Sequence, residues 1–252
     1  MSEKFNGILP VDIGLYKNEL PAQCDDNYIL TSIDIASGIG VLEEDEFFVE
    51  AGTVAYFTTR VALLDILSAG GKPITTAFAT SLSNNYYEEI EAGILRSLDE
   101  WQGEEKNLIT GSTEDNFKPK QTSISIMITG ISNKNELNWL QVNQGDKLFI
   151  IGKPLVGEQV LINKDKIINS EVFKNLIRDK STKNLMPVGS GGAVQRINYI
   201  LSKTGLKFKS SNSHLEKKSA GPATAVLLIS NSGIDYYRDK IEIPITYLGK
   251  LI

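Results

Sequence analysis

Four acidic places along the chain have the residue types that hold a hard cation. They are Asp25-Asp26 before an apolar run, Asp34 near the end of that run, Asp65 in a helical segment, and Glu114-Asp115 in a polar loop. Mg²⁺ is bound by carboxylates and waters, usually one or two protein acids together with substrate phosphates. Acids from separate segments therefore favour a nucleotide–metal site. The alternative is that each acid caps or solvates its own loop, and spacing alone does not decide.

Asp65 occupies an unfavourable position for an acid. Apolar residues recur around it at three-to-four spacing, which predicts a helix with one apolar stripe. The stripe consists of Val54, Phe57, Val61, Leu64 and Leu67. Gly70, Gly71 and Pro73 end the helix, so Asp65 lies in its last turn. A helix C-terminus carries about half a negative charge, which costs an acid there roughly 0.3–1 kcal/mol. Asp65 therefore requires a cation or a donor nearby.

Two further features have types suited to phosphate. In the loop Gly189-Ser190-Gly191-Gly192, which precedes a helical segment, glycines free backbone N–H groups to face an anion. An ordinary flexible turn is the alternative, and it is favoured when the loop is considered by itself. Arg60, on the same helix as Asp65, has the type to bind phosphate bidentately, although a surface salt bridge is the more frequent role. No Walker-type phosphate loop and no Rossmann glycine motif occurs.

Composition excludes several other classes. One cysteine and one histidine, Cys24 and His214, rule out an internal disulfide, a multi-cysteine metal site and a His cluster. His214 lies in a charged stretch typical of exposure, and no nucleophile elbow supports hydrolase chemistry. The net charge of −5 and scattered basic residues argue against nucleic acid. No apolar run is long enough to span a membrane and no signal peptide is visible, so we expect a cytoplasmic protein.

Strand-like and helix-like segments alternate, which predicts an α/β fold. Strands are expected at residues 28–35, 74–80, 122–129, 147–152 and 224–230. Helices are expected at 86–101, after the capping residues Ser83-Asn84-Asn85, at 170–180, and at 192–202 with a close at Gly205. The first of these places Ile90, Ile94, Leu98 and Trp101 on one face. Polar residues 143–146 mark a seam between two domains, 1–142 and 143–252.

Several blocks, in order, resemble the aminoimidazole ribonucleotide synthetase superfamily, which includes thiamine monophosphate kinase, selenophosphate synthetase and a hydrogenase maturation protein. Leu30-Thr-Ser-Ile-Asp34 looks like its strand ending in a metal-binding aspartate, and the segment from Arg60 through Asp65 to Pro73 looks like its helix with a second aspartate. Thr110-Gly111-Ser112-Thr113-Glu114-Asp115 is similar to a third block. Gly145-Asp146 with Leu148–Gly152 is similar to the opening of the second domain.

The match is closest to the branch of α-ribazole kinases in cobalamin salvage. The segments that resemble this branch are Asp34–Gly40, Gly111–Asn116, Pro187–Ser190 and Lys218–Thr224. Together with the superfamily blocks they extend the resemblance over nearly the whole chain.

Three positions depart from the superfamily pattern, in a chain shorter than typical members. Thiamine monophosphate kinases carry Gly-Gly-Asp-Thr in the third block, so Ser112 replaces the acid and Glu114 or Asp115 must supply it. Cys24-Asp25-Asp26 stands where Gly-Asp-Asp is usual. The resemblance therefore implies a metal-binding role at this motif for Asp26 alone. Val188-Gly-Ser-Gly191 stands where the second domain has Asp-Ile-Ser-Asp-Gly, so that acid has no counterpart.

The resemblance implies two domains, each a mixed sheet covered by helices, with first domains pairing in a homodimer and ATP as cofactor. The implied reaction is ATP- and Mg²⁺-dependent phosphorylation of α-ribazole to its 5′-phosphate. Mg²⁺ would be held by acids from the set Asp26, Asp34, Asp65, Glu114 and Asp115, with Asp34 and Asp65 catalytic. Backbone groups of 110–113 and 189–192, with Arg60, would bind ATP, and Asn116, Ser219, Gly221 and Pro222 the substrate.

Two alternatives stay open. One is another ATP-using small-molecule enzyme of the same superfamily, such as a thiamine monophosphate kinase. The other is a non-catalytic nucleotide-binding protein, motivated by the altered acids of the third block and of the second domain. The identity of the phosphate acceptor separates the first alternative from the α-ribazole kinase, and the absence of turnover would mark the second.

Overall fold

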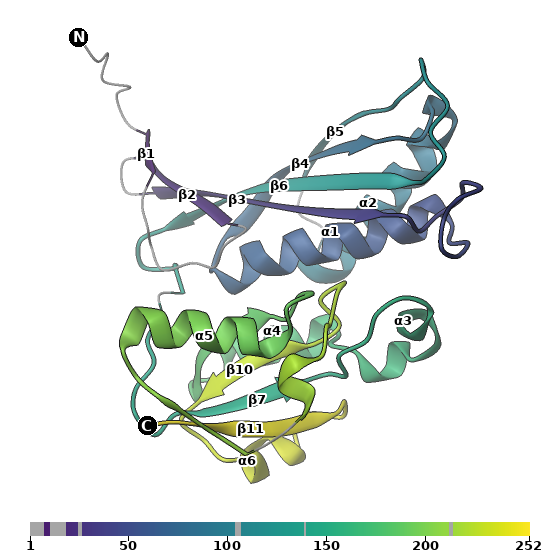
Figure 1. Cartoon of the computed structure of the whole chain (residues 1–252). Coiled ribbons are helices and arrows are strands. Elements are labelled where there is room, and N and C mark those ends of the chain that lie inside the picture. The colour runs from purple at the N-terminus through teal and green to yellow at the C-terminus, as the bar shows by residue number, and fades with distance from the viewer. Residues whose placement is uncertain (1–7, 11–18, 25–26, 104–106, 139, 212–213) are drawn as a thin grey trace. The chain divides into compact units, whose positions relative to one another are not determined.

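The chain forms two compact units, residues 1–137 and 138–252, each with its own sheet and helices (Figure 1). The computed structural model describes residues 8–10, 19–24, 27–103, 107–138, 140–211 and 214–252. The expected mixed α/β fold with two helix-covered sheets is confirmed. Residues 143–146, expected as the seam, form a turn inside the second unit, closed by a hydrogen bond from the Asp146 N–H to the Asn143 carbonyl.

The first unit contains a six-stranded sheet in the order β1-β2-β3-β6-β4-β5. All neighbouring strands are antiparallel except β4 and β5, which are parallel and joined through a helix. The central pair runs from Asn27 opposite Asn133 to Ser37 opposite Ser123. The strands are β1 (Ile8–Pro10), β2 (Glu19–Cys24), β3 (Asn27–Ser37), β4 (Lys72–Thr80), β5 (Leu108–Ser112) and β6 (Ser123–Asn133).

Two helices cover one face of this sheet. Helix α1 (Ala51–Ser68) packs against β3 and β6, and α2 (Tyr87–Gln102) packs against α1 after a 3₁₀ turn, η1 (Asn84–Tyr86). Because α1 packs against both the sheet and α2, it is buried on more than one side. The predicted single stripe is therefore wrong: Val54 and Leu64 are buried, but Phe57, Val61 and Leu67 are only partly so. Ala62, Leu63 and Ile66 are fully buried instead.

Helix α2 matches its prediction, with Ile90, Ile94, Leu98 and Trp101 all buried. No side-chain hydrogen bond caps its N-terminus or that of η1, contrary to the expected capping by Ser83-Asn84-Asn85. A side chain of α2 instead serves α1: the Gly52 N–H, one of the unpaired donors at the start of α1, donates to Glu89 Oε1 at 2.9 Å. The helices approach closely there, since a Cβ on Gly93 would overlap the Gly52 carbonyl.

Helix α1 ends as its glycines predict. Gly70 has φ 82°, a left-handed conformation that favours glycine. Its N–H donates to the Leu67 carbonyl, and the Gly71 N–H donates to the Ile66 carbonyl. This pair of bonds is the Schellman arrangement, which satisfies two carbonyls of the last turn. Asp65 therefore lies in the last turn, as expected.

The second unit contains a five-stranded antiparallel sheet in the order β8-β10-β7-β11-β9. Its strands are β7 (Lys147–Ile151), β8 (Thr182–Pro187), β9 (Phe208–Ser210), β10 (Val226–Ser230) and β11 (Ile245–Leu251). Its helices are α3 (Glu158–Ile162), η2 (Lys164–Lys166), α4 (Ser170–Arg178), α5 (Gly192–Thr204), η3 (His214–Lys217) and α6 (Ile234–Arg238). Helix α5 closes at left-handed Gly205, as predicted, and buries Ile197 and Ile200 against the sheet.

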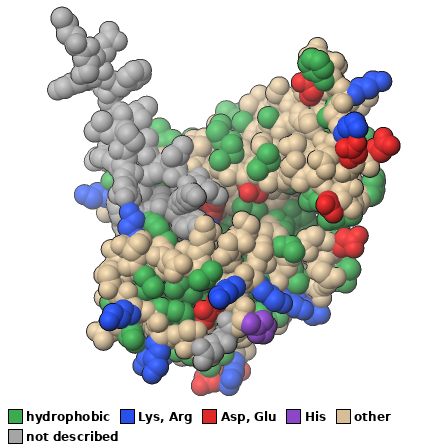
Figure 2. All heavy atoms as spheres, viewed as in Figure 1, with side chains coloured by type: hydrophobic (Ala, Val, Ile, Leu, Met, Phe, Trp, Pro, Cys, Tyr) green, Lys and Arg blue, Asp and Glu red, His purple; other side chains and the backbone are tan. Residues whose placement is uncertain are grey.

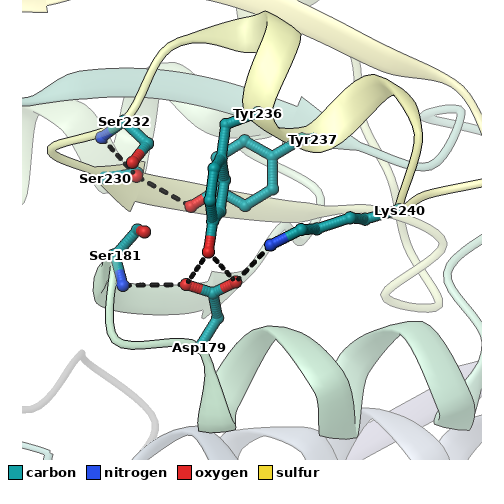
Figure 3. A network of polar contacts seen from close by, with 7 residues as sticks. All are labelled: Asp179, Ser181, Ser230, Ser232, Tyr236, Tyr237 and Lys240. Atoms are coloured by element: carbon teal, nitrogen blue, oxygen red, sulfur yellow. Dashed lines mark hydrogen bonds and ion pairs between the residues drawn. The ribbon is translucent and has the colours of Figure 1, made fainter.

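A network of polar contacts ties α6 to the turn between α4 and β8 (Figure 3). The Asp179 carboxylate accepts hydrogen bonds from the Ser181 N–H at 2.8 Å and from the Tyr236 hydroxyl at 2.9 and 3.1 Å. Lys240 lies 3.7 Å from it and over the Tyr236 ring. Burial raises the pKa of Asp179, but these hydrogen bonds and Lys240 outweigh burial and leave the pKa below its ordinary value.

Asp179→Asn should lower the free energy of unfolding at pH 7 by about 1–1.5 kcal/mol, because the charged acceptor of these hydrogen bonds becomes a neutral amide oxygen. A depressed pKa in the folded state means that this contribution is present above about pH 4, the range of an unfolded Asp, and is lost as the pH falls further. Urea unfolding at pH 7 and pH 3 measures both values. In the control Asp235→Asn only an exposed pair with Arg238 is removed, so an equally large loss there would contradict the assignment.

Candidate active site

The first unit brings Asp34 and Asp65 together. On β3, side chains alternate, so Ser32 and Asp34 both face α1. The Ser32 hydroxyl donates to Asp65 Oδ2 at 3.2 Å, which supplies the donor that the sequence required near the end of α1. Asp65 is 3% exposed and Ser32 is 1% exposed. The site therefore contains a carboxylate that is almost fully removed from water.

Burial and the neighbouring Asp65 both affect the second carboxylate, that of Asp34. Burial raises the pKa of Asp34 to about 7, a backbone hydrogen bond from Ile35 opposes the rise, and the charge of Asp65 adds to it. Near neutral pH, Asp34 is thus poised between its charged and neutral forms. Two nearby acids with a shifted pKa are typical of functional sites, because the charge of one carboxylate disfavours the ionisation of the other.

Two glycines let α1 come close enough for this arrangement. A Cβ on Gly71 would lie 2.7 Å from Leu30 and 2.9 Å from Ile66, and a Cβ on Gly130 would lie 2.7 Å from the same Ile66 side chain. Such distances are shorter than real contacts allow. The Ile66 side chain thus lies close to β3 and β6, which fixes the rotation of α1 and directs the adjacent Asp65 toward Ser32.

Glu114 and Asp115 accept hydrogen bonds from their own loop, and Asp115 also accepts one from the start of η1. Glu114 Oε1 accepts from the N–H groups of Asn116 at 2.7 Å and Phe117 at 3.2 Å. Asp115 accepts from the Asn84 N–H and the Thr113 hydroxyl, and these bonds lower its pKa. Asp26 lies outside the described residues. Among the residues that are described, no group of three or more acidic, histidine or cysteine side chains is close enough to hold a metal ion.

The third sequence block begins on an edge strand. Thr110, Gly111 and Ser112 belong to β5, which pairs in parallel with β4 at the border of the sheet. Gly111 lies opposite Phe78, and a Cβ on Gly111 would overlap the Phe78 ring. The described contacts therefore give Gly111 a packing role, beside the phosphate-binding role expected of it.

Gly111→Ala should destabilise the protein by about 1–3 kcal/mol, because the added methyl group must displace the Phe78 ring. The unfolding midpoint in urea is the measurement. Gly189→Ala is the matched control, since a Cβ on Gly189 meets nothing within 4 Å. Equal stability of the two variants would contradict the packing role.

Arg60 is buried where α1 packs against α2. It is 2% exposed, and its guanidinium lies over the Trp101 ring of α2, 5.0 Å from the centroid. Burial lowers its pKa to about 10, while the nearby Tyr56 and Glu100 oppose the change. Burial excludes a position of Arg60 on the surface, and the phosphate binding expected of it stays a prediction.

In the second unit the loops expected to bind phosphate and substrate are neighbours. The Ala220 N–H donates to the Gly189 carbonyl at 3.2 Å, and a Cβ on Gly192 would lie 3.0 Å or less from the backbone of residues 216–218. Ser190 and Gly191 are exposed, and Ser219, Gly221 and Pro222 are half-buried. The two loops thus form one surface at the start of α5, whereas Asn116 lies exposed in the first unit.

Two residues of these sites were not singled out from the sequence. Ser32 follows from strand alternation, since it stands two residues before Asp34 and shares its face. Thr224 joins two loops of the second unit: its buried hydroxyl oxygen accepts from the Leu155 N–H at 3.0 Å. No local pattern signals that contact, because it joins residues 69 positions apart.

Within the described part of the chain, no helix combines the length and apolar character needed to cross a membrane. No protein-family model matches the sequence, and no curated protein matches it either. The comparison with solved structures, in contrast, finds a shared fold.

The two-unit mixed α/β fold is that of thiamine monophosphate kinases and of HypE. AaThiL complexed with AMPPCP and TMP aligns with a TM-score of 0.60 and 16% identity over 93% of this chain and 84% of its own. E. coli HypE, a hydrogenase maturation protein, aligns with a TM-score of 0.63 and 13% identity over 88% of this chain and 79% of its own. Thiamine-monophosphate kinase from Stenotrophomonas maltophilia K279a aligns with a TM-score of 0.58 and 14% identity over 98% of this chain and 89% of its own. The superfamily resemblance is thus confirmed for the fold, and the α-ribazole kinase branch stays a prediction.

Proposed function

We propose that this protein is an ATP-dependent phosphotransferase whose acceptor is a small nucleoside-like alcohol, α-ribazole. The observation that carries the proposal is the pair of half-buried Asp34 and buried Asp65 on a fold shared with AaThiL, which was determined in complex with AMPPCP and TMP. Phosphoryl transfer depends on positioning and on neutralising the charge of the triphosphate. Two carboxylates at one place supply the ligands for that task.

The donor set fits Mg²⁺. Carboxylate oxygens are the ligands that Mg²⁺ prefers, and a dication beside Asp34 would favour its charged form by cancelling the repulsion from Asp65. When bound, Mg²⁺ would neutralise phosphate charge. The Ser32 hydroxyl orients Asp65 by its hydrogen bond, and the exclusion of water around Asp65 strengthens electrostatic interactions there.

A third acid would complete the proposed Mg²⁺ site, and the sequence offers three candidates for it. Glu114 would join Asp34 and Asp65 only by giving up hydrogen bonds from its own loop, and Asp115 only by giving up those from the Asn84 N–H and the Thr113 hydroxyl. Asp26 is the remaining candidate from the sequence. Backbone groups of residues 110–113 and 189–192 are proposed for the phosphates, and Asn116 with residues 219–222 for the acceptor.

Two alternatives to α-ribazole follow from the same fold. A thiamine monophosphate kinase would use the same ATP chemistry on another acceptor, and it is supported by the neighbours named above. A non-catalytic nucleotide-binding protein is supported by Ser112, which stands where those kinases have an acid. The acceptor dependence of ADP release distinguishes all three.

ADP release should require ATP, Mg²⁺ and α-ribazole together, and thiamine monophosphate should not replace α-ribazole. Asp65→Asn and Asp34→Asn should each reduce this rate by about 100-fold or more, because charge stabilisation of the triphosphate is lost. Asp99→Asn, an exposed acid of α2, is the control and should retain the rate within about twofold. Full activity of Asp65→Asn would exclude the metal assignment. ADP release with ATP, Mg²⁺ and thiamine monophosphate, but not with α-ribazole, would exclude α-ribazole as the acceptor.

We also propose a homodimer formed by the sheet of the first unit. The face of this sheet opposite α1 exposes apolar side chains on β3, β6 and β5. Ile33 and Ile35 are 54% and 60% exposed, and Ile33 lies directly opposite Met127 on β6. Ile131 and Leu108 extend the face, and Figure 2 shows hydrophobic side chains over these strands. Contiguous exposed apolar area of this kind marks an interface.

Ile33→Asp should convert a dimer into a monomer, because a charge would be buried without a partner at the centre of the apolar face. Light scattering coupled to size-exclusion chromatography gives the mass. Leu95→Asp is the control: Leu95 is an exposed leucine on α2, on the other side of the unit, and its variant should stay dimeric. A wild-type protein with the monomer mass would refute the interface.

A further inference from the structure

The two units carry opposite net charge. Residues 1–137 contain 9 Lys and Arg against 22 Asp and Glu, a net charge of −13. Residues 138–252 contain 17 against 9, a net charge of +8. The total of −5, on which the argument against nucleic acid rested in part, therefore hides a basic unit. Figure 2 shows Lys and Arg side chains distributed over that unit. A surface of this charge attracts anions.

Four lysines of the basic unit share one face of its sheet. Lys250 on β11 lies directly opposite Lys209 on β9 and, on its other side, directly opposite Lys147 on β7. Residues directly opposite on paired strands point to the same face, with Cα atoms about 4.5–5.5 Å apart. Lys207 joins them, because it exchanges both backbone hydrogen bonds with Ile252 and alternates with Phe208. We call these four residues the lysine row.

The lysine row is not neutralised by the described part of the protein. Lys207, Lys209 and Lys250 are exposed, and no ion pair joins any of them to an acid among the described residues. Lys147 donates a hydrogen bond to the Asn231 carbonyl at 3.1 Å, which leaves its charge uncompensated. Like charges directly opposite on neighbouring strands destabilise a sheet. The free protein thus maintains an unfavourable arrangement.

Protection of a sheet edge does not account for the row. Lysines on an edge strand do discourage unwanted pairing, and β9 is an edge strand. Lys250 and Lys147, however, lie on β11 and β7, each of which has a strand on both sides. Their charges serve no edge, so they need another explanation.

We propose that the lysine row docks a short acidic segment of a partner protein. Carboxylates two residues apart on an extended chain are about 7 Å apart, a spacing that a row of long, flexible lysines accommodates. A long nucleic acid suits the surface less well, because the first unit would repel it and the row contains no arginine. The aromatic residues on the same face, Phe149 and Tyr247, are buried and half-buried, so no stacking platform is open.

The test uses the full chain and a fluorescent peptide of about twelve residues that alternates Glu and Ser. Fluorescence anisotropy should show binding that weakens as salt rises. Lys250→Glu should weaken binding by about tenfold or more, because it reverses the central charge of the row. Lys164→Glu changes the net charge equally at an exposed lysine elsewhere on the same unit and should leave binding nearly unchanged.

A stability readout separates docking from a structural role. Lys250→Glu replaces two like-charged cross-strand pairs by two opposite-charged ones, so its unfolding midpoint should rise while binding falls. A lowered midpoint with lost binding would assign the row a structural role and overturn the proposal. No peptide binding by the wild type, equal loss in both variants, or tighter binding of an oligothymidylate of equal charge would overturn it as well.

Discussion

The burial of Asp65 against β3 is the interaction on which the first unit depends. A carboxylate at the C-terminal end of a helix, almost fully removed from water, opposes both the helix dipole and the cost of desolvation. It is tolerated because several features act together. The Schellman turn at Gly70 and Gly71 satisfies the helix carbonyls, Ser32 supplies a donor, and bare backbone at Gly71 and Gly130 admits Ile66. Residues with side chains at those glycines would separate α1 from the sheet.

The sequence predicted those features that depend on local pattern. Residues 28–35 and 74–80 are rich in β-branched or alternating side chains, and they form strands close to the expected limits. Strands β1, β2, β5, β9, β8 and β11 were not predicted, and the last two show the reason. Strand β8, Thr-Lys-Asn-Leu-Met-Pro, lacks alternation and ends in proline, and β11 contains Gly249 at an irregular register. Both are strands because of the neighbours with which they pair, and a local window does not contain those neighbours.

The site was predictable in part for the same reason. The need of Asp65 for a donor follows from its place in a helix, and the Ser32 hydroxyl is one donor that the structure supplies. The burial of Arg60 depends on Trp101, which is 41 positions away and reaches it only because α2 packs on α1. Glu114 and Asp115 resemble metal ligands by type and order, yet Glu114 accepts a hydrogen bond from its own turn and Asp115 accepts one from the Asn84 N–H, 31 positions away. Residue type therefore indicated the chemistry, and tertiary packing determined which groups meet.

The pairing of β3 with β6 has a consequence for how the first unit forms. This central pair joins residues 27–37 to residues 123–133, so most of the sequence of the unit lies between the two paired strands. Closing so long a loop is entropically costly and slows folding, whereas α1 and α2 are joined through a much shorter segment. We infer that the helical pair precedes the complete sheet during folding. On a ribosome, β3 and α1 would emerge well before β6, and the sheet that fixes Asp34 beside Asp65 would be completed by the last strand of the unit to appear.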